Sequence, residues 1–241
     1  MKAMIFAAGL GTRLKPLTDN KPKALIEVYG KTLLEHTIVK LISSGVTDII
    51  INVHAFADQI IDFLKLNNNF GIHIEFSDET DLLLDTGGGL KKAAWFFDDN
   101  NPFILHNVDI LSDIDLNEMY KQHIAANCLA TLAMDNRETN RYFLLNQNHE
   151  LCGWENSKTK VKIISKSGKI SSKLAFSGIH IISPEIFSHF ENDHIFSITS
   201  KYLELSKNHK ILAYQPNNTY WFDVGKKNDL GKAEQFLKSI N

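Results

Sequence analysis

Short apolar runs alternate with segments of helical periodicity along the first part of the chain. Four runs have the length and apolar content of buried strands: Lys2–Ala8, Asp48–Val53, Ile72–Phe76 and Phe103–Leu105. Three segments between them repeat apolar residues at helical spacing: Leu33–Ser44, Ala57–Leu66 and Gly87–Phe97. This alternation predicts βαβ units, and hence an α/β fold with a doubly wound, mostly parallel sheet.

The pattern changes after an expected helix over Leu116–Asn127 and an expected strand over Leu129–Met134. Residues 135–172 are mostly polar, and turn residues separate their three short candidate strands: Phe143–Leu145, Leu151–Trp154 and Val161–Ile164. Such a stretch favours a small antiparallel flap over another βαβ unit. Two further helices are expected over Ile198–Ser206 and Asn228–Ile240. Because no linker or repeat interrupts the chain, we expect one domain over residues 1–241 with the flap inserted at about 135–172.

Composition and charge exclude several classes of function. The chain has 26 basic and 28 acidic side chains, and this balance argues against broad nucleic-acid binding. Its apolar start lacks a signal-peptide cleavage pattern, and no apolar run approaches the ~20 residues of a membrane span. Cys128 and Cys152 have no metal-like spacing and are expected to be reduced thiols. We therefore expect a soluble cytoplasmic protein, without a nucleic-acid or membrane partner.

The loop from Gly9 to Lys23 carries the clearest chemistry. It follows the first expected strand, and its glycines let backbone N–H groups approach an anion closely. Arg13 adds a fork of donors suited to phosphate oxygens, and Lys23 adds a mobile positive charge. The alternative is a surface turn with incidental basic residues. The spacing fits neither a Walker loop nor a dinucleotide fingerprint, which counts against a Rossmann oxidoreductase.

The order Gly-x-Gly-Thr-Arg-x-x-Pro-x-Thr, followed by Pro-Lys, resembles the signature loop of the sugar-1-phosphate nucleotidyltransferases. The resemblance implies a Rossmann-like sheet of the nucleotide-diphospho-sugar transferase type and a loop that wraps a nucleoside triphosphate. By this resemblance, Arg13 holds the departing pyrophosphate and Lys23 sits over the reacting phosphates. The nucleotide-binding residues that it implies here are Ala8, Gly9, Gly11, Thr12, Arg13 and Lys23.

A glycine triplet provides a second candidate loop, Thr86–Gly89, at the start of an expected helix. Glycines at a helix N-terminus allow close approach and leave N–H donors free, although they also permit tight helix–sheet packing. Residues 84–93 resemble a subgroup that includes N-acetylmuramate-1-phosphate uridylyltransferases, and mannose-1-phosphate guanylyltransferases carry a similar segment. The resemblance implies that Thr86, Gly87 and Gly88 face the nucleobase and ribose. It leaves the choice of base open.

Two aspartates far apart in sequence are expected to hold one metal ion. Asp109 follows the fourth expected strand, where a carboxylate can bind Mg²⁺ together with phosphate oxygens. Residues Trp221–Gly225 resemble the late Trp-x-Asp-x-Gly motif of the family, which implies that Asp223 is the second ligand. The family usually has glycine where this chain has Val108, so close approach of the backbone there is in doubt. Asp113 and Asp115 are expected to cap or precede the next helix.

A third segment of the chain resembles the part of the family's sequence that lines the sugar pocket. Residues Phe176–His180 match the family segment that lines the sugar site, which implies sugar contacts from Ser177 and Gly178, with Asn107 nearby. Gly178 could instead mark a bulge in a packed strand.

His54 is expected to orient a loop through a hydrogen bond rather than to act as an acid or base. Four basic residues of the flap could contact the sugar phosphate or form a solvated face: Arg141, Lys158, Lys160 and Lys162.

These features predict a Mg²⁺-dependent nucleotidyltransferase whose partners are a nucleoside triphosphate and a sugar 1-phosphate. Asp109, Asp223, Arg13 and Lys23 would form its catalytic set. UTP and N-acetylmuramate 1-phosphate, as in cell-wall recycling, are the preferred substrates, and GTP with mannose 1-phosphate is the alternative. Phosphocholine cytidylyltransfer is a more distant possibility. A nucleotide-sugar-binding regulatory protein without activity is the competing class. A monomer or weak homodimer is expected.

Overall fold

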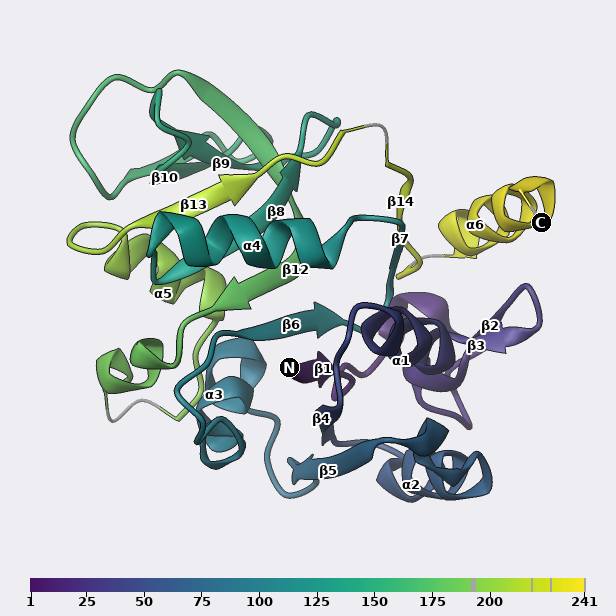
Figure 1. Cartoon of the computed structure of the whole chain (residues 1–241). Coiled ribbons are helices and arrows are strands. Elements are labelled where there is room, and N and C mark those ends of the chain that lie inside the picture. Colours follow the sequence, from purple (N-terminus) through teal and green to yellow (C-terminus); the bar gives the residue numbers. More distant parts are fainter. Residues whose placement is uncertain (192–193, 218, 226, 241) are drawn as a thin grey trace. The chain divides into compact units, whose positions relative to one another are not determined.

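The structure is a computed structural model that describes residues 1–191, 194–217, 219–225 and 227–240 (Figure 1). The chain forms two compact units. The first unit contains Met1–Leu84, Leu105–Ile114 and Thr219–Asn241, and the second contains Asp85–Ile104 and Asp115–Asn218. The expectation of a single domain stays a prediction.

Three parallel strands and two helices organise the first unit. They are β1 (Lys2–Phe6), α1 (Leu33–Ser43), β4 (Asp48–Val53), α2 (Ala57–Leu66) and β5 (His73–Asp78). Strand β4 pairs in parallel with β1 on one side and with β5 on the other, and α2 lies beside β5 in Figure 1. The α/β fold class predicted from the alternating pattern is therefore confirmed.

Smaller elements complete this unit. They are η1 (Thr12–Leu14), η2 (Lys23–Leu25), β2 (Glu27–Val28), β3 (Lys31–Thr32), η3 (Asn68–Gly71), β7 (Ile110–Ser112), β14 (Trp221–Asp223) and α6 (Lys227–Ile240). Strand β6 (Phe103–Asn107) spans the boundary between the units. The hairpin of β2 with β3 has no counterpart among the elements predicted from sequence, and neither does β7, which pairs with β14.

The first helix shows why these segments fold as they do. The hydroxyl of Thr32 accepts a hydrogen bond from the Glu35 backbone N–H at 3.0 Å, so the sequence Thr-Leu-Leu-Glu caps the start of α1. Leu34, Ile38 and Leu41 recur on one face, and all three side chains are fully buried. The helix is therefore fixed at its first residue by a cap and along its length by burial.

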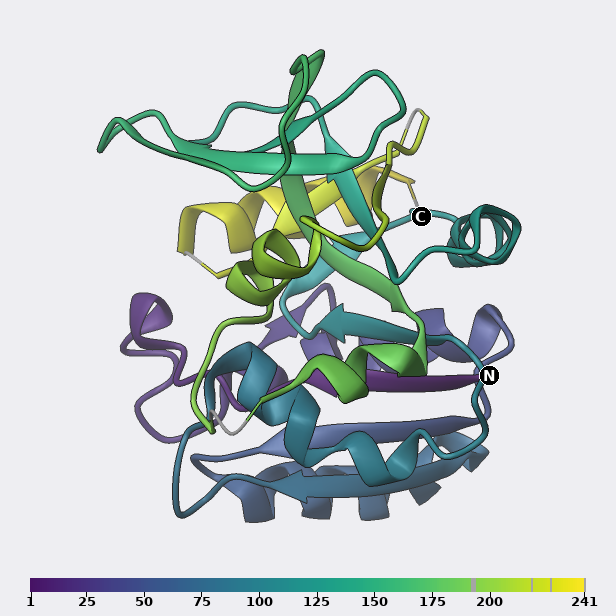
Figure 2. The same ribbon diagram turned by 90° about the vertical axis from the view of Figure 1, so that its left-hand side faces the viewer.

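The second unit is built mainly from antiparallel strands. Its elements are α3 (Asp85–Lys92), η4 (Ala94–Phe96), α4 (Leu116–Ala126), β8 (Ala130–Asp135), β9 (Arg141–Leu145), β10 (Leu151–Asn156), β11 (Val161–Ile164), β12 (Ser172–Ile182), η5 (Pro184–His189), α5 (Ile198–Leu205) and β13 (Ile211–Tyr214). Strand β12 pairs antiparallel with β8 and β9, and β10 pairs with β9 and β11. Strands β9 to β11, near the top of Figure 2, form the antiparallel flap expected within 135–172.

The predicted elements agree with the observed ones, with differences at their ends. The helix expected over Gly87–Phe97 is divided into α3, which begins at Asp85, and the short η4. Asp115 caps α4 as expected, because its carboxylate accepts a hydrogen bond from Glu118 N–H at 3.0 Å. Within the described ranges, no helix has the length and apolar character needed to cross a membrane. Cys128 and Cys152 are both free and buried.

A buried histidine in each unit lacks an acidic hydrogen-bonding partner among the described residues. His123 contacts the hydroxyls of Thr131 (2.9 Å) and Ser183 (3.0 Å) in the second unit. The Ser183 hydroxyl donates its hydrogen to Cys128 O, so it accepts from His123 Nε2–H, which identifies the tautomer. In the first unit, His106 Nδ1 lies 2.8 Å from Asn107 O. Burial lowers the pKa of His106 and of His123 to about 4.

This burial predicts an acid-sensitive fold. An unfolded histidine takes up its proton near pH 6.5, whereas these two do so only near pH 4, so between these values the unfolded state binds more protons. The free energy of unfolding should therefore fall as pH falls, by about 2 kcal/mol per histidine from pH 7 to pH 5. Urea unfolding at both pH values measures the loss. Histidine ring NMR should find His106 and His123 still neutral at pH 5, and titration of either of them near pH 6.5 would contradict the assignment.

Candidate active site

The loop after β1 is folded against its own later residues. Gly11 has a left-handed backbone (φ 62°), and the Thr18 hydroxyl donates to Gly11 O at 2.9 Å. A side chain on Gly11 would meet Thr18 Cγ2 at 2.9 Å and Lys23 Cβ at 3.1 Å. Glycine is therefore required here both for its conformation and for close approach. The next turn, η1, buries Leu14 and leaves Arg13 exposed.

The start of the same loop is held by Asn52, at the end of β4. Asn52 Oδ1 accepts hydrogen bonds from the backbone N–H of Ala7 (2.7 Å) and Ala8 (3.3 Å), and its Nδ2 donates to Glu79 Oε1 at 2.7 Å. Asn52 and Glu79 are both buried. Neither residue is among the catalytic or binding residues expected from sequence. The available signal was a single polar side chain, Asn52, within the apolar run Asp48–Val53.

Lys23 and Asp109 form an ion pair in this unit. The ammonium of Lys23 donates to Asp109 Oδ2, and both side chains are largely buried, with 11% and 16% of their surface exposed. Lys23 begins η2 at the end of the glycine-rich loop, and Asp109 lies between β6 and β7. The structure thus brings together two of the expected catalytic residues that are far apart in sequence.

Strand β14 brings Asp223 to the same place. It pairs antiparallel with β7 so that Asp223 lies opposite Ile110, and Val224 N–H donates to Asp109 O at 2.9 Å. The Asp223 carboxylate accepts a hydrogen bond from Gly225 N–H at 2.9 Å. The two aspartates expected to share a metal ion are therefore held side by side by the backbone.

Arg13 reaches this group through Gly225. A side-chain carbon on Gly225 would lie 2.7 Å from Arg13 Nη2 and 2.7 Å from Asp223 Oδ1. The four expected catalytic residues thus lie together: Arg13 and Asp223 both approach Gly225, Asp223 adjoins Asp109 across paired strands, and Asp109 binds Lys23.

We expect Gly225→Ala to lower turnover at least about tenfold, because the new methyl group would displace Arg13 and Asp223 from this arrangement. The backbone of Gly225 is not in the left-handed region, so the fold should tolerate alanine. Steady-state pyrophosphate release and thermal unfolding check both statements. Gly231→Ala in α6 is the matched control, because a side chain there would meet nothing within 4 Å. Equal activity of both variants would contradict the role assigned to the close approach.

The residue next to Asp109 departs from the expected glycine without disturbing the backbone. Val108 is buried, and its N–H donates to Phe6 O at 3.2 Å. The neighbouring Asn107 is half-buried at the end of β6. His106 Nε2 is buried without a hydrogen-bond partner among the described residues. The Val108 side chain therefore packs in the interior.

In the second unit, the first two glycines of the triplet contact Phe196. The N–H groups of Gly87 and Gly88 both donate to Phe196 O, at 2.8 and 3.3 Å, and Thr86 Oγ1 accepts from Ile198 N–H at 3.0 Å. A side chain on Gly87 would lie 2.3 Å from the Phe196 ring. The expectation of free N–H donors at Gly87 and Gly88 is thus wrong. Recognition of a nucleobase by Thr86, Gly87 and Gly88 stays a prediction.

Two of the three expected sugar residues, Ser177 and Gly178, lie in β12. The pairing of β12 with β8 shifts register between Phe176 and His180, and Gly178 has a left-handed backbone (φ 76°). Gly178 therefore marks a bulge, as the alternative reading held. The Ser177 side chain is fully buried. Sugar binding by Asn107, Ser177 and Gly178 stays a prediction.

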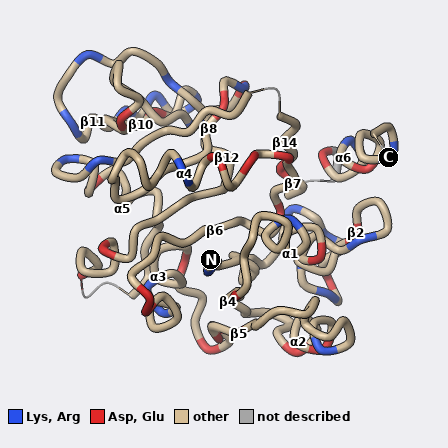
Figure 3. The backbone as a smooth tube through the Cα atoms, viewed as in Figure 1, with Lys and Arg blue, Asp and Glu red and all other residues tan. Residues whose placement is uncertain are grey.

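The remaining candidates are His54 in the first unit and the basic residues of the flap in the second. His54 Nδ1 lies 2.6 Å from Glu79 O, so this histidine orients a loop as expected. Figure 3 shows the flap around β10 and β11 with several Lys and Arg positions. Four of these basic residues are exposed: Arg141, Lys158, Lys160 and Lys162. A role for them in binding the sugar phosphate stays a prediction.

Comparisons with known proteins bear on this site. The nucleotidyl transferase family matches residues 2–240. The chain is 31% identical over 233 residues to an N-acetylmuramate alpha-1-phosphate uridylyltransferase of Caulobacter vibrioides, an alignment that covers 92% of this chain and 91% of that protein. It is 29% identical over 247 residues to mannose-1-phosphate guanyltransferase 2 of Candida glabrata, covering all of this chain and 66% of that protein.

A solved structure supports the fold. The putative glucose-1-phosphate thymidylyltransferase of Bacillus anthracis, determined in complex with a sucrose, superposes with a TM-score of 0.78 at 20% identity. The match covers all of this chain and 96% of that one. The match to almost the whole length of the chain agrees with the expectation drawn from the glycine-rich loop. The chain belongs to the nucleotidyl transferase family.

Proposed function

We propose that this chain forms a nucleotide-sugar and pyrophosphate from a nucleoside triphosphate and a sugar 1-phosphate. A phosphate oxygen of the sugar 1-phosphate attacks the α-phosphorus of the triphosphate. The bond from that phosphorus to the oxygen bridging the α- and β-phosphates breaks, and pyrophosphate leaves with the electron pair. Because the attacking oxygen is already anionic at neutral pH, the reaction needs no general base from the protein.

The observation that carries this proposal is the grouping of Arg13, Lys23, Asp109 and Asp223 in the first unit. Positioning and charge neutralisation supply most of the catalysis in phosphoryl transfer. Arg13 is exposed within the glycine-rich loop, where its guanidinium can bind the departing pyrophosphate. Lys23 would stabilise the α-phosphate while it is attacked.

The donor set at Asp109 and Asp223 fits Mg²⁺. Two carboxylates on adjacent backbone segments match its preference for one or two carboxylates together with phosphate oxygens. Asp109 Oδ2 is bound by Lys23 and Asp223 Oδ1 by Gly225 N–H, so the other oxygen of each carboxylate is the one offered to a cation. The ion, when bound, would neutralise the phosphate charge.

The Lys23–Asp109 ion pair fixes the positions of both side chains before substrate binds. An ammonium paired with the carboxylate keeps both side chains oriented and lowers the cost of burying each charge. When the triphosphate binds, Lys23 can exchange the carboxylate for a phosphate oxygen without leaving the loop. The proposal therefore requires Lys23 to change partner during the reaction.

UTP and N-acetylmuramate 1-phosphate are the substrates that we favour, because the relative from Caulobacter vibrioides aligns over nearly its whole length. The sequence segment 84–93 favours the same subgroup. GTP and mannose 1-phosphate are the second candidate pair, supported by the mannose-1-phosphate guanyltransferase that aligns with this entire chain. A cytoplasmic location and a role in cell-wall recycling would follow from the first pair.

Product analysis by mass spectrometry separates these possibilities. The purified protein is incubated with Mg²⁺ and either UTP with N-acetylmuramate 1-phosphate or GTP with mannose 1-phosphate. We expect the UDP-linked sugar from the first pair and at most a trace of product from the second. Product from the second pair alone would transfer the assignment to GDP-mannose synthesis. Binding of nucleotide-sugar without any product would identify a regulatory protein.

A further inference from the structure

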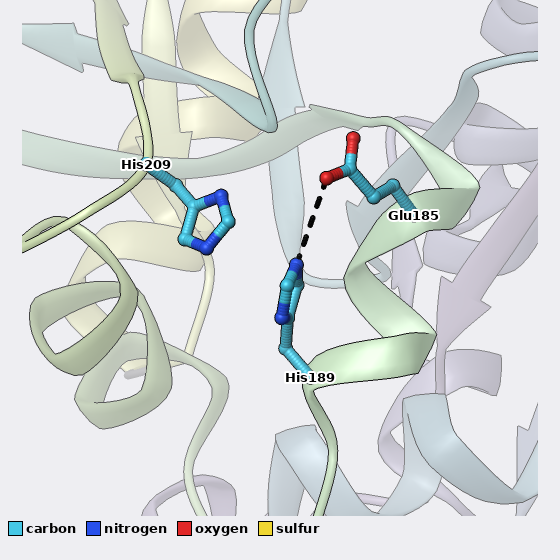
Figure 4. A group of neighbouring side chains, drawn as sticks. All are labelled: Glu185, His189 and His209. Carbon is cyan, nitrogen blue, oxygen red and sulfur yellow. Dashed lines mark ion pairs between the residues drawn. The ribbon is translucent and has the colours of Figure 1, made fainter.

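Three metal-ligating side chains converge in the second unit, in a cluster that the proposed reaction does not use: Glu185, His189 and His209 (Figure 4). Each offers one ligand atom, and these three atoms lie within 4.8 Å of one another. Glu185 and His189 come from η5, and His209 comes from the segment between α5 and β13. Figure 4 shows all three side chains directed toward a common centre.

The contacts within the cluster leave donor atoms unused. His189 Nε2 is buried and has no hydrogen-bond partner among the described residues. It lies 3.7 Å from Glu185 Oε1, which is too long for a hydrogen bond. The His189 and His209 rings approach to 4.3 Å between centroids. A buried imidazole nitrogen without a hydrogen-bond partner costs free energy, and a bound cation would remove that cost.

Both backbone segments that carry the cluster, η5 and the segment before β13, are held in place by neighbouring residues. Phe187 of η5 stacks on Phe103 at 5.7 Å, and the buried Ile186 anchors the same turn. His209 N–H donates to Leu205 O at 2.8 Å, immediately before β13 pairs with β8. Only side-chain rotation is then needed to close the site. Donors of a tetrahedral zinc ion lie about 3.4 Å apart, and the exposed Glu185 can move by the required amount.

We propose that Glu185, His189 and His209 bind a divalent transition-metal ion of the zinc type, with two imidazole nitrogens and one carboxylate oxygen as protein ligands. Imidazole donors favour Zn²⁺, Ni²⁺ and Cu²⁺ over Mg²⁺ and Ca²⁺. The ion would connect η5 to the segment before β13 and so stabilise the second unit. This site is independent of the proposed reaction, since none of its residues belongs to the set at Asp109.

Calorimetric titration of the chelator-treated full-length protein with ZnCl₂, in excess Mg²⁺, tests the proposal. We expect one zinc site, and we expect His189→Asn and His209→Asn each to weaken it at least about tenfold, because each removes a ligand. His149→Asn, at an exposed histidine of the same unit, is the matched control and should bind zinc as the wild type does. Zinc should also raise the melting temperature of the wild type but not of the two ligand variants.

A second readout separates loss of ligands from loss of fold. The metal-free ligand variants should melt near the metal-free wild type, because Asn keeps a polar side chain at both positions. Histidine ring NMR should show two imidazoles shifted by zinc. Zinc affinity unchanged in both ligand variants would overturn the proposal, as would zinc-induced shifts confined to other histidines.

Discussion

Asp109→Asn should reduce nucleotide-sugar synthesis by about 10³-fold or more while leaving the protein folded. The substitution removes the negative charge that is offered to Mg²⁺ and that pairs with Lys23, but it keeps the size of the side chain. The amide oxygen still accepts a hydrogen bond from the Lys23 ammonium, so we expect the free energy of unfolding to fall by only about 1–2 kcal/mol. Steady-state pyrophosphate release and urea unfolding measure the two effects.

Asp115→Asn is the matched control for this experiment. Asp115 caps α4 through Glu118 N–H, and asparagine is an equally good cap, so activity and stability should both match the wild type. Near-normal pyrophosphate release by Asp109→Asn would show that the carboxylate does not hold the reacting phosphates. An unfolded Asp109→Asn protein would show instead that the ion pair is needed mainly for stability.

Lys23→Met should lower kcat/KM by about 10²–10³-fold. Methionine keeps most of the apolar stem that packs near Gly11, but it removes the ammonium that we assign to the α-phosphate. Because the charge is needed most in the transition state, we expect the loss mainly in kcat. Initial rates over a range of triphosphate concentrations separate kcat from KM.

Lys21→Met supplies the comparison for this variant. Lys21 lies two residues earlier in the same loop, and its side chain is exposed. Lys21→Met lowers the net charge of the loop by the same amount as Lys23→Met. It therefore tests whether catalysis needs only a positive loop or needs the charge at position 23. We expect less than about a threefold effect, in line with the small contribution of exposed charges. Similar losses in the two variants would assign the effect to loop charge rather than to the position of Lys23.

Local sequence signals account well for the elements that lie close together along the chain. The β-branched run Asp48–Val53 forms β4 with the predicted bounds, and the predicted helices over 33–44 and 57–66 correspond to α1 and α2 within one residue. These elements could be predicted because the spacing of apolar residues and the capping residues of a helix are encoded within a few neighbouring positions. The glycine-rich loop could be predicted as a phosphate site because its donors are also contiguous.

Contacts between distant segments could not be derived from local patterns. The pairing of β7 with β14, which brings Asp109 beside Asp223, joins two three-residue strands that carry no period of their own. The expectation that these aspartates meet came from the resemblance of their motifs. The role of Phe196, which takes up the N–H groups of Gly87 and Gly88, likewise depends on a partner far away in sequence. A glycine triplet alone does not distinguish a ligand site from close packing.

The role of Asn52 also could not be predicted from its neighbours in sequence. Its position in an apolar strand marks it as unusual, but its function depends on the N–H groups of Ala7 and Ala8, which directly follow the neighbouring strand β1. Only the parallel register of β1 with β4 brings these groups together. The loop that we assign to the triphosphate is thus positioned by a residue outside it.

Pyrophosphate release in the presence of Mg²⁺ tests the central proposal most directly. UTP, GTP, CTP, ATP and dTTP are each combined with the 1-phosphates of N-acetylmuramate, glucosamine, glucose and mannose. We predict release that requires both a triphosphate and a sugar 1-phosphate, with the highest rate for UTP and N-acetylmuramate 1-phosphate. A folded protein that releases no pyrophosphate with any pair would contradict the proposed activity.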